Sequence, residues 1–343
     1  MVVTIMDVAK EANVSKSTVS LVMNNSDSVK LETRIKVLDA IQKLGYVPNM
    51  AARELTTKVK NILGLVFLTD NATNRSYQFD SVTETLLYDT FNGISSGMKQ
   101  TDFGLLSERF SALEPNQELP SLLKNNRVDG VFIVGGLFDD AFIQRVQQRK
   151  IAAVLVGRNY PGIDWVAPDV LDAMYKGTKY LLETGHQDIV FLLGPQTSPV
   201  AHKKLEGICK ALDEAGLPLR PDAFKYCDYS GSSGYNSMKE LWTSGIGMDA
   251  VFAASDGIAM GAMRFLYDQK VRIPDDISIV GYEQSVITEH AVPALTTIDI
   301  NKERMGEEAL RILLNRISRP KAKPVQLMIA PSLVIRDTVK KRR

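Results

Sequence analysis

The sequence predicts a mixed α/β protein with a small all-α segment at the N-terminus, followed by two doubly wound parallel-sheet subdomains. Three observations lead to this fold class. Short continuous apolar runs recur from residue 62 onward, as expected for parallel strands that are covered on both faces. Helical patterns lie between these runs, and strand–helix alternation is typical of a parallel α/β sheet. Before residue 60 the apolar residues instead follow a helical spacing.

The composition fits a soluble globular protein with two or three domains. The chain has 343 residues, of which 45% are hydrophobic and 24% are charged, and both fractions are ordinary for a folded protein. The net charge is +1, but residues 1–60 hold nine basic and six acidic residues, and the remainder holds 32 and 34. The basic excess near the N-terminus indicates a polyanionic partner for that segment.

Several classes of protein are not expected. No apolar run resembles a signal peptide or a membrane span, so we expect a cytoplasmic protein without a membrane partner. The two cysteines and three histidines have no metal-ligand spacing. Residues 93–97, GISSG, match a hydrolase motif but sit in a helical pattern, whereas that motif requires a preceding strand. No nucleotide-binding motif follows a strand, so we expect neither a cofactor nor an enzyme.

Residues 1–45 predict three short helices. Thr4 and Asp7 have the spacing of a capping box at the start of the first helix. The inward face of this helix is expected to hold Ile5, Val8, Ala9 and Ala12. Asn13 occupies the following turn, where a left-handed residue is wanted, and Ser15 is placed to cap the second helix.

The first and second helices, joined by a turn of three to four residues, predict a helix-turn-helix. If Val19 and Val22 face inward, the polar start of the second helix faces outward. In such an arrangement the N-terminal residues of this helix contact base edges and phosphates. The alternative is that its hydroxyl groups only cap and solubilise the helix. The third helix is expected from about Leu31 to Leu44, with a core stripe of Ile35, Leu38, Ile41 and Leu44.

A fourth, shorter helix is expected within residues 46–60. Pro48 stops the third helix and Asn49 can cap a new one. This helix is too short to be stable alone in water, so it should be ordered only when something packs on it.

The remaining chain predicts two similar subdomains with a cleft between them. The strand runs are residues 62–68, 128–136, 152–156, 188–195, 249–255 and 277–282. Residues 69–85 are expected to form a long polar loop near the mouth of the cleft, and residues 330–337 a late strand. The terminal KKRR is expected to be disordered.

Four segments closely resemble the lactose-repressor/galactose-repressor (LacI/GalR) family of bacterial transcription regulators. They are TIMDVAKEANVSKSTVSLVMNN, ETRIKVLDAIQKLGYVPNMAAREL, LLETGHQDIVFLLGP and SDGIAMGAMRFLYDQKVRIPDDISIVGYE, the last followed by PALTTI. They cover nearly the whole chain in the order and spacing of the family. The resemblance implies a homodimer, each subunit having a helix-turn-helix head, a hinge helix and a core similar to a type I periplasmic sugar-binding protein.

The resemblance also implies which residues contact DNA. Leu55 matches a leucine that wedges into a minor-groove base step, and Arg53 matches a neighbouring contact. Lys16 and Ser17 match the base-contacting pair of the recognition helix. The chain departs from the family at Leu21, where an arginine is common, and at Lys30, where a capping serine is common. The expected DNA contacts are Thr4, Ser15, Lys16, Ser17, Thr18, Ser20, Leu21, Asn24, Lys30, Thr33, Asn49, Ala52, Arg53 and Leu55.

A small-molecule effector site in the cleft is implied in the same way. Lys204 stands where the family has a ligand-clamping arginine, and it lacks the bidentate fork of that residue. Glu283 replaces a family aspartate, and Tyr229 matches an aromatic residue that stacks on sugar rings in some members. The expected effector contacts are Asp169, His202, Lys204, Tyr229, Ser255, Asp256 and Glu283. For each charged residue among them, a solvated surface position is the alternative.

The expected boundaries are residues 1–45 for the head, 46–60 for the hinge, 61–158 with 290–322 for the N-terminal core subdomain, 159–289 with 323–339 for the C-terminal one, and 340–343 for a basic tail. From the resemblance we expect an allosteric, dimeric repressor of a carbohydrate-utilisation operon. Its partners would be a pseudo-palindromic operator in double-stranded DNA and a carbohydrate effector. A purine ligand, a phosphorylated partner protein and, in another class, a solute-binding protein without DNA function are the alternatives.

Overall fold

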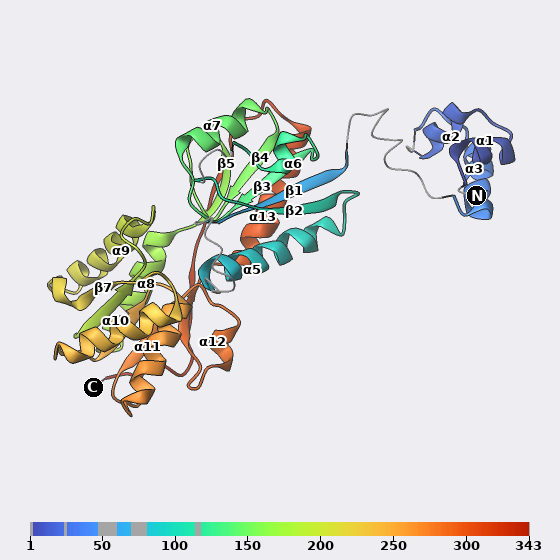
Figure 1. The fold of residues 1–343 in the computed structure, drawn as a ribbon. Helices are drawn as coiled ribbons and strands as arrows, with labels where there is room; N and C mark the ends of the chain where they lie inside the picture. The colour runs from blue at the N-terminus through green and yellow to red at the C-terminus, as the bar shows by residue number, and fades with distance from the viewer. Residues whose placement is uncertain (1–2, 24–25, 47–59, 70–80, 114–117, 343) are drawn as a thin grey trace. The chain divides into compact units, whose positions relative to one another are not determined.

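The computed structural model describes residues 3–23, 26–46, 60–69, 81–113 and 118–342, with the side chains of 81–85 left aside. The chain forms two compact units, Met1–Lys60 and Asn61–Arg343. The ribbon of each unit is drawn in Figure 1.

The first unit contains the three helices expected from the sequence. They are α1 (Ile5–Glu11), α2 (Lys16–Met23) and α3 (Leu31–Leu44). The backbone N–H and the hydroxyl of Thr4 both donate to the Asp7 carboxylate, at 2.8 and 2.7 Å. The Ser15 hydroxyl accepts from the N–H of Thr18 at 3.1 Å and so caps α2, and Asn13 is left-handed with φ 51°. The residues that join α1 to α2 thus have the conformations expected from their types.

The predicted core stripe of α3 is half wrong. Ile35 and Leu38 are each 50% exposed, whereas Val37 and Ala40 are buried against α1 and α2. The inward face instead holds Val37, Ala40, Ile41 and Leu44, so only the second half of the predicted stripe faces the core. The sequence offered two apolar faces on one helix, and periodicity alone does not decide which of them meets the core.

The second unit contains two six-stranded sheets. The first sheet has the order β11-β5-β4-β3-β1-β2, and its neighbouring strands all pair in parallel. Its strands are β1 (Ile62–Leu68), β2 (Gly104–Phe110), β3 (Gly130–Val134), β4 (Ala152–Val156), β5 (Asp164–Pro168) and β11 (Gln326–Ile329). Helices α5 (Ser81–Met98) and α13 (Lys302–Ser318) cover one face, and α6 (Ser121–Lys124) and α7 (Asp140–Gln148) cover the other.

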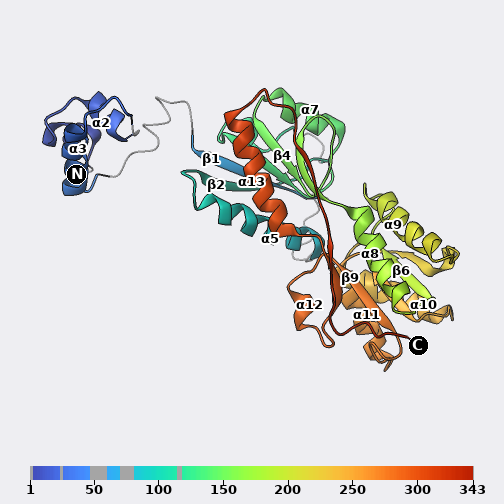
Figure 2. The same cartoon turned by 180° about the vertical axis from the view of Figure 1, so that it is seen from behind.

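The second sheet has the order β12-β10-β9-β8-β6-β7, and only β12 runs antiparallel to its neighbour. Its strands are β6 (Ile189–Leu193), β7 (Phe224–Tyr226), β8 (Ala250–Ala253), β9 (Ser278–Tyr282), β10 (Thr296–Asp299) and β12 (Ser332–Val334). Its helices are α8 (Val170–Glu183) and α9 (Ala201–Glu214) on one face, α10 (Gly231–Thr243) and α11 (Asp256–Asp268) on the other, with the short η1 (Pro221–Ala223) and α12 (Ile287–His290) beside them. The view from behind shows the last segment of the chain running from one sheet to the other (Figure 2).

The chain crosses between the subdomains later than the sequence predicted. The predicted crossings were at residues 158–159, 289–290 and 322–323, but β5 and β11 belong to the first sheet and β10 belongs to the second. The observed crossings therefore follow β5, β10 and β11. The physical reason is that each of these strands pairs with a partner of its own subdomain before the chain leaves it, and two of them are only four residues long.

The C-terminal residues lie against the second subdomain, which corrects the prediction of a disordered tail. The backbone N–H of Arg342 donates to the carbonyl of Thr184 at 2.7 Å, and its guanidinium donates to the carbonyl of Asp276 at 2.7 Å. A run of cations predicts a solvated tail, but the donors of this arginine satisfy carbonyl groups at the ends of two elements.

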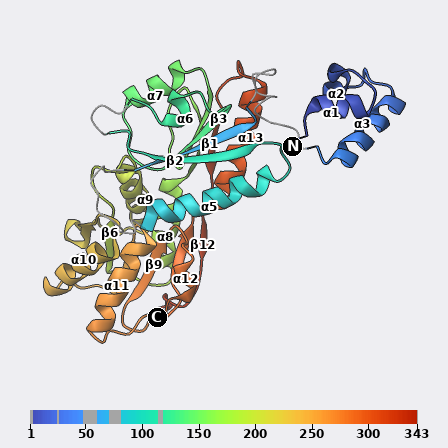
Figure 3. The same ribbon diagram turned by 45° about the vertical axis from the view of Figure 1, so that its right-hand side comes forward.

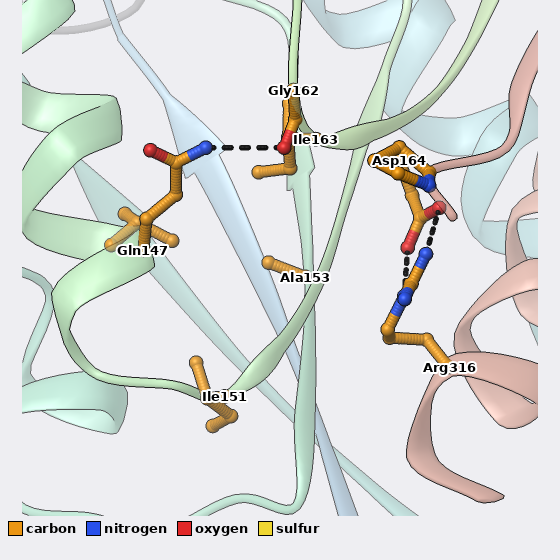
Figure 4. Close-up of a pocket in the computed structure, with 9 residues that line it drawn as sticks. Gln147, Ile151, Ala153, Gly162, Ile163, Asp164 and Arg316 are labelled. Carbon is orange, nitrogen blue, oxygen red and sulfur yellow. Dashed lines mark hydrogen bonds and ion pairs between the residues drawn. The ribbon is translucent and has the colours of Figure 1, made fainter. Parts of the chain in front are cut away.

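A buried ion pair closes the amino-terminal edge of the first sheet. Both oxygens of Asp164, at the start of β5, accept from the guanidinium of Arg316 at 2.7 and 2.9 Å. Their side chains are only 3% and 14% exposed. The pair lines a cavity of about 180 Å³ in which the Gln147 amide donates to the carbonyl of Gly162 (Figure 4). The pair therefore fixes α13 to β5, the strand after which the chain crosses to the second subdomain.

We expect Arg316→Met to lower the free energy of unfolding by about 3–5 kcal/mol, because it leaves a buried carboxylate without its partner. Urea unfolding followed by circular dichroism measures this change. Arg311→Met, at an arginine on the same helix whose side chain is 67% exposed, is the control and should lose less than about 1 kcal/mol. Equal losses in the two variants would contradict the structural role given to the pair.

Candidate functional site

The cleft of the core lies where the carboxyl ends of the two parallel sheets meet. One narrow cavity of about 20 Å³ is lined by residues that follow β4, Gly157–Asn159, and by Val200 and Lys203 beside the start of α9. A second cavity of about 10 Å³ is lined by residues from the second subdomain alone, among them Gly194, Lys204 and Tyr229. Ligands of open parallel sheets bind outside the carboxyl ends of the strands, so this is the expected place for an effector.

Lys204 is a buried cation at the centre of the cleft residues. It is 5% exposed, and its ammonium donates to the carbonyl of Ala254 at 2.9 Å. The ammonium also lies 4.4 Å from the ring centroid of Tyr282 and 5.3 Å from that of Tyr229. Burial lowers the pKa of Lys204 to about 8, and the nearby Glu283 carboxylate opposes this shift. The site therefore holds a desolvated donor of the kind that binds hydroxyl or carboxylate oxygens.

Tyr229 fills the space above a glycine. Its backbone is left-handed with φ 70°, and its ring lies where a side chain on Gly194 would be, so only glycine fits there. The Tyr229 hydroxyl donates to the Ser198 hydroxyl at 3.3 Å. The aromatic residue expected from the sequence is thus in the cleft, where it covers the end of β6.

Ser255 and Asp256 are parts of the framework around the cleft. Ser255 caps α11 by accepting from the N–H of Ile258 at 3.2 Å. Asp256 is fully buried, and its two oxygens accept from the N–H of Ser285 and from the hydroxyl of Thr297, both at 2.6 Å. Burial raises the pKa of Asp256 to about 6, and the two hydrogen bonds oppose this rise. Its carboxylate supports the loop after β9 and is engaged by protein groups.

Asp169 and Glu283 both act electrostatically on Tyr282, the last residue of β9. Asp169 caps α8 by accepting from the N–H of Asp172 at 3.0 Å. Tyr282 is 5% exposed, and burial raises the pKa of its phenol, with smaller contributions from Glu283 and Asp169. The structure thus brings Asp169, Lys204, Tyr229, Ser255 and Glu283 together, with Asp256 behind them.

His202 is not part of this group. It is exposed on the first turn of α9, and among the contacts of the described residues none joins it to the cluster. Sequence reasoning also missed two residues. Tyr282 precedes Glu283 directly, and Arg158 follows β4, where its guanidinium lies 3.9 Å from the Phe138 ring centroid. A search for polar or aromatic residues just after each predicted strand would have found Arg158.

None of these cluster residues lines the larger cavity of about 420 Å³. It is lined by Asp89, Gln284, Lys302, parts of α12 and the first turns of α13. The cavity beside the Asp164 ion pair lies at the start of β5, whereas the cleft lies at the carboxyl ends of the strands. Cavity size alone therefore does not identify the effector site in this chain.

The N-terminal unit presents one polar helix start to its surface. Lys16, Ser17 and Leu21 are exposed on α2, while Val19 and Val22 are buried. The Ser15 hydroxyl bonds to those of Ser17 and Thr18 at 2.7 and 2.8 Å. The remaining residues of the expected DNA surface are exposed, as Thr4 and Lys30, or half-buried, as Ser20 and Thr33.

Lys30 forms no capping bond at the start of α3, in agreement with the loss expected from its sequence. Asn24, Asn49, Ala52, Arg53 and Leu55 lie outside the described residues.

The fold and these two surfaces define a class of protein: a helix-turn-helix unit in one chain with a two-subdomain ligand-binding core. This is the architecture of a ligand-responsive transcription regulator. Residues 4–49 match the model of "Bacterial regulatory proteins, lacI family", and residues 178–339 match that of a periplasmic binding protein-like domain.

Curated relatives extend over the whole chain. The transcriptional regulator CelR of Thermobifida fusca is 33% identical over 336 residues, which is 96% of each chain. The transcriptional repressor PurR of Erwinia tasmaniensis is 31% identical over 340 residues, or 98% of this chain and 96% of that protein. The chain therefore belongs to the LacI family of bacterial regulatory proteins, whose relatives named here are transcription regulators.

Solved structures agree with this assignment. A complex of the transcriptional regulator CelR with cellobiose has a TM-score of 0.73 at 30% identity, and the match covers 98% of this chain and 99% of that one. The lac repressor dimer bound to operator and the anti-inducer ONPF has a TM-score of 0.80 at 27% identity, covering 99% and 100%. Among the described residues, no helix is both long and apolar enough to span a bilayer.

The lowered pKa of Lys204 predicts a pH dependence of stability. Between about pH 8 and 10.5 the unfolded chain holds this proton and the folded chain loses it, so the free energy of unfolding rises with pH in that window. Lys204→Met lacks this contribution. Across the window the free energy of unfolding of wild type should therefore rise, relative to that of the variant, by up to about 3 kcal/mol.

Urea unfolding at several pH values from 7.5 to 10.5 tests this prediction. Lys210→Met, at an exposed lysine of the same helix, is the control and should follow wild type. Parallel curves for wild type and Lys204→Met would show that the ammonium is not desolvated in the folded protein.

Proposed function

We propose that the chain acts in the cytoplasm as a homodimeric repressor whose affinity for a pseudo-palindromic operator is switched by a carbohydrate in the core cleft. The observation that carries the ligand class is the cluster of Lys204, Tyr229 and Glu283 at the carboxyl ends of the second sheet. A cation, a carboxylate and an aromatic ring within one cleft suit a ring that carries several hydroxyl groups.

Two further observations support the sugar. The CelR structure, similar over almost the whole chain, is described as a cellobiose complex. Lysine in place of a guanidinium supplies single donors, which suits separate hydroxyls better than a planar carboxylate.

The PurR relatives raise a purine as the second candidate. A purine requires flat surfaces on both of its faces. Tyr229 supplies one ring, but Tyr282, whose ring also lies near the Lys204 ammonium, is only 5% exposed. The phosphorylated-protein alternative has no comparable support from the described residues.

For DNA, we propose that α2 enters the major groove with Lys16, Ser17 and Leu21 toward the bases. These side chains are exposed together while the opposite face of α2 is buried. Because a two-fold dimer presents two such helices, the operator should consist of two related half-sites. An effector changes operator affinity only through its different affinities for the two states of the core.

We expect a carbohydrate among mono- and disaccharides and sugar phosphates to raise the melting temperature of the purified protein. A thermal-shift screen that includes nucleobases as the second arm measures this. Tyr229→Ala should abolish the shift, while Tyr267→Ala, at a tyrosine that is 74% exposed, is the matched control. If a nucleobase raises the melting temperature and no sugar does, the effector is a purine and not a carbohydrate.

We expect Lys16→Ala to change the preferred base of the half-site and Lys30→Ala to weaken all sequences alike. A lysine in the major groove contributes about 1–3 kcal/mol of base discrimination, whereas a phosphate contact contributes none. Binding to a randomised half-site library followed by sequencing measures both effects. An unchanged base preference in Lys16→Ala would mean that Lys16 contacts the DNA phosphate backbone and not the bases. The absence of any symmetric footprint on DNA would contradict the proposal of a dimeric repressor.

A further inference from the structure

Lys302 is a buried lysine outside both the proposed effector contacts and the proposed DNA contacts. It is the first residue of α13, directly after the chain leaves β10, and it is 3% exposed. Its ammonium donates to the carbonyls of Glu283 and Gln284 at 2.6 and 3.3 Å and pairs with the Asp89 carboxylate at 3.0 Å. An ammonium has three donors, and all three are used.

Two of these partners belong to a loop with an unusual backbone. Glu283 and Gln284 follow β9 and are consecutive left-handed residues, with φ 97° and 50°. Such conformations are unfavourable for non-glycine residues and persist only where their surroundings hold them. Both carbonyls of the pair accept from the Lys302 ammonium. The cation therefore stabilises a conformation that the local sequence disfavours.

The same loop is held from its other side by two further bonds. The N–H of Glu283 donates to the carbonyl of Ile298 at 2.7 Å, and the N–H of Ser285 donates to the buried Asp256 carboxylate at 2.6 Å. The loop is thus fixed at 283, 284 and 285 in succession. It carries the Glu283 carboxylate, which lies close enough to Lys204 to raise the pKa of that lysine.

The third partner, like Lys302 itself, belongs to the first subdomain. Asp89 lies on α5, which packs along α13 on the first sheet (Figure 3). The two helices approach so closely that a side chain on Gly93 would meet the backbone of Glu303, and one on Gly306 would meet that of Thr90. Because these glycines allow backbone contact one turn from Asp89, the position of Asp89 relative to α13 is fixed.

We propose that Lys302 is a positioning residue that ties the ligand-facing loop Tyr282–Ser285 of the second subdomain to Asp89 on α5 of the first. The proposal rests on the cleft being the effector site. Through this tie the ligand-facing Glu283 is shaped by the first subdomain, and a change in the angle between the subdomains strains the contacts that hold Glu283. The ammonium thus couples ligand binding to the arrangement of α5.

The loop itself can be tested without any ligand. Amide hydrogen exchange of full-length Lys302→Met should be faster than in wild type by about tenfold or more in peptides that cover 282–286, since two charge-assisted hydrogen bonds are lost. Lys340→Met is the control, because this lysine is 56% exposed and pairs with Asp275 at 2.6 Å within the second subdomain. Exchange of these peptides in the control should match wild type. If exchange in Lys302→Met also equals that of wild type, Lys302 does not position the loop.

The coupling is tested by separating loop support from the ion pair that anchors Lys302 to α5 within the first subdomain. Asp89→Asn keeps both loop carbonyl bonds and removes only the ion pair, so effector affinity measured by calorimetry should stay within about threefold of wild type. The ratio of operator affinities with and without effector should fall by about threefold or more. Lys302→Met should lower effector affinity itself by about tenfold or more.

An Asp89→Asn variant with an unchanged operator ratio would show that the ion pair transmits nothing, and this result stands even if Lys302→Met fails to fold. If no small molecule binds wild type, the proposed function is wrong, but the exchange of residues 282–286 still decides whether Lys302 positions the loop.

Discussion

The core depends on strand pairing between residues far apart in the sequence. β11 pairs with β5, about 160 residues earlier, and so returns the chain to the first sheet after α13 has been laid across it. β12 then pairs with β10 in the second sheet. Because three strands are each followed by a crossing, neither subdomain is a continuous piece of chain. The cleft is bounded by chain segments that leave a strand of one sheet and enter the other subdomain.

This connectivity explains why the charged residues beside the crossings are held in place by the protein backbone. Asp169 follows β5 at one crossing, and Lys302 follows β10 at another. Both combine a local backbone role with a position between the subdomains, Asp169 as the cap of α8 and Lys302 as the donor to two carbonyls. A charged residue at a crossing cannot move without disturbing the start of a helix, so the electrostatics and the geometry of the cleft change together.

The sequence predicted well what depends on local chemistry. The six apolar runs all became strands, and the caps at Thr4 and Ser15 formed from residues within three positions of each other. It predicted poorly what depends on distant partners. β2 was missed because GLLSERF is an edge strand with charged residues, and β7 because it has only three residues.

The cleft shows the same division. Lys204, Tyr229 and Glu283 were found because each matches a position of the family's effector site, and they do lie together. Asp256 was predicted as a ligand contact, yet both its oxygens are engaged by Thr297 and Ser285, which are 41 and 29 residues away. Nothing in the local pattern distinguishes a carboxylate that faces a ligand from one that faces a loop. The burial of Lys302 was invisible for the same reason.

The fit of the Tyr229 ring against Gly194 has a consequence for selectivity. The phenol already occupies the volume at the end of β6, and the cavity beside it is only about 10 Å³. Any molecule that enters there competes with a side chain of the protein itself, and its observed affinity is reduced by the cost of moving that ring. Solutes that gain little binding free energy do not offset this cost and therefore do not bind measurably. The Tyr229 ring thus sets a minimum intrinsic affinity that a molecule must have to occupy the cleft.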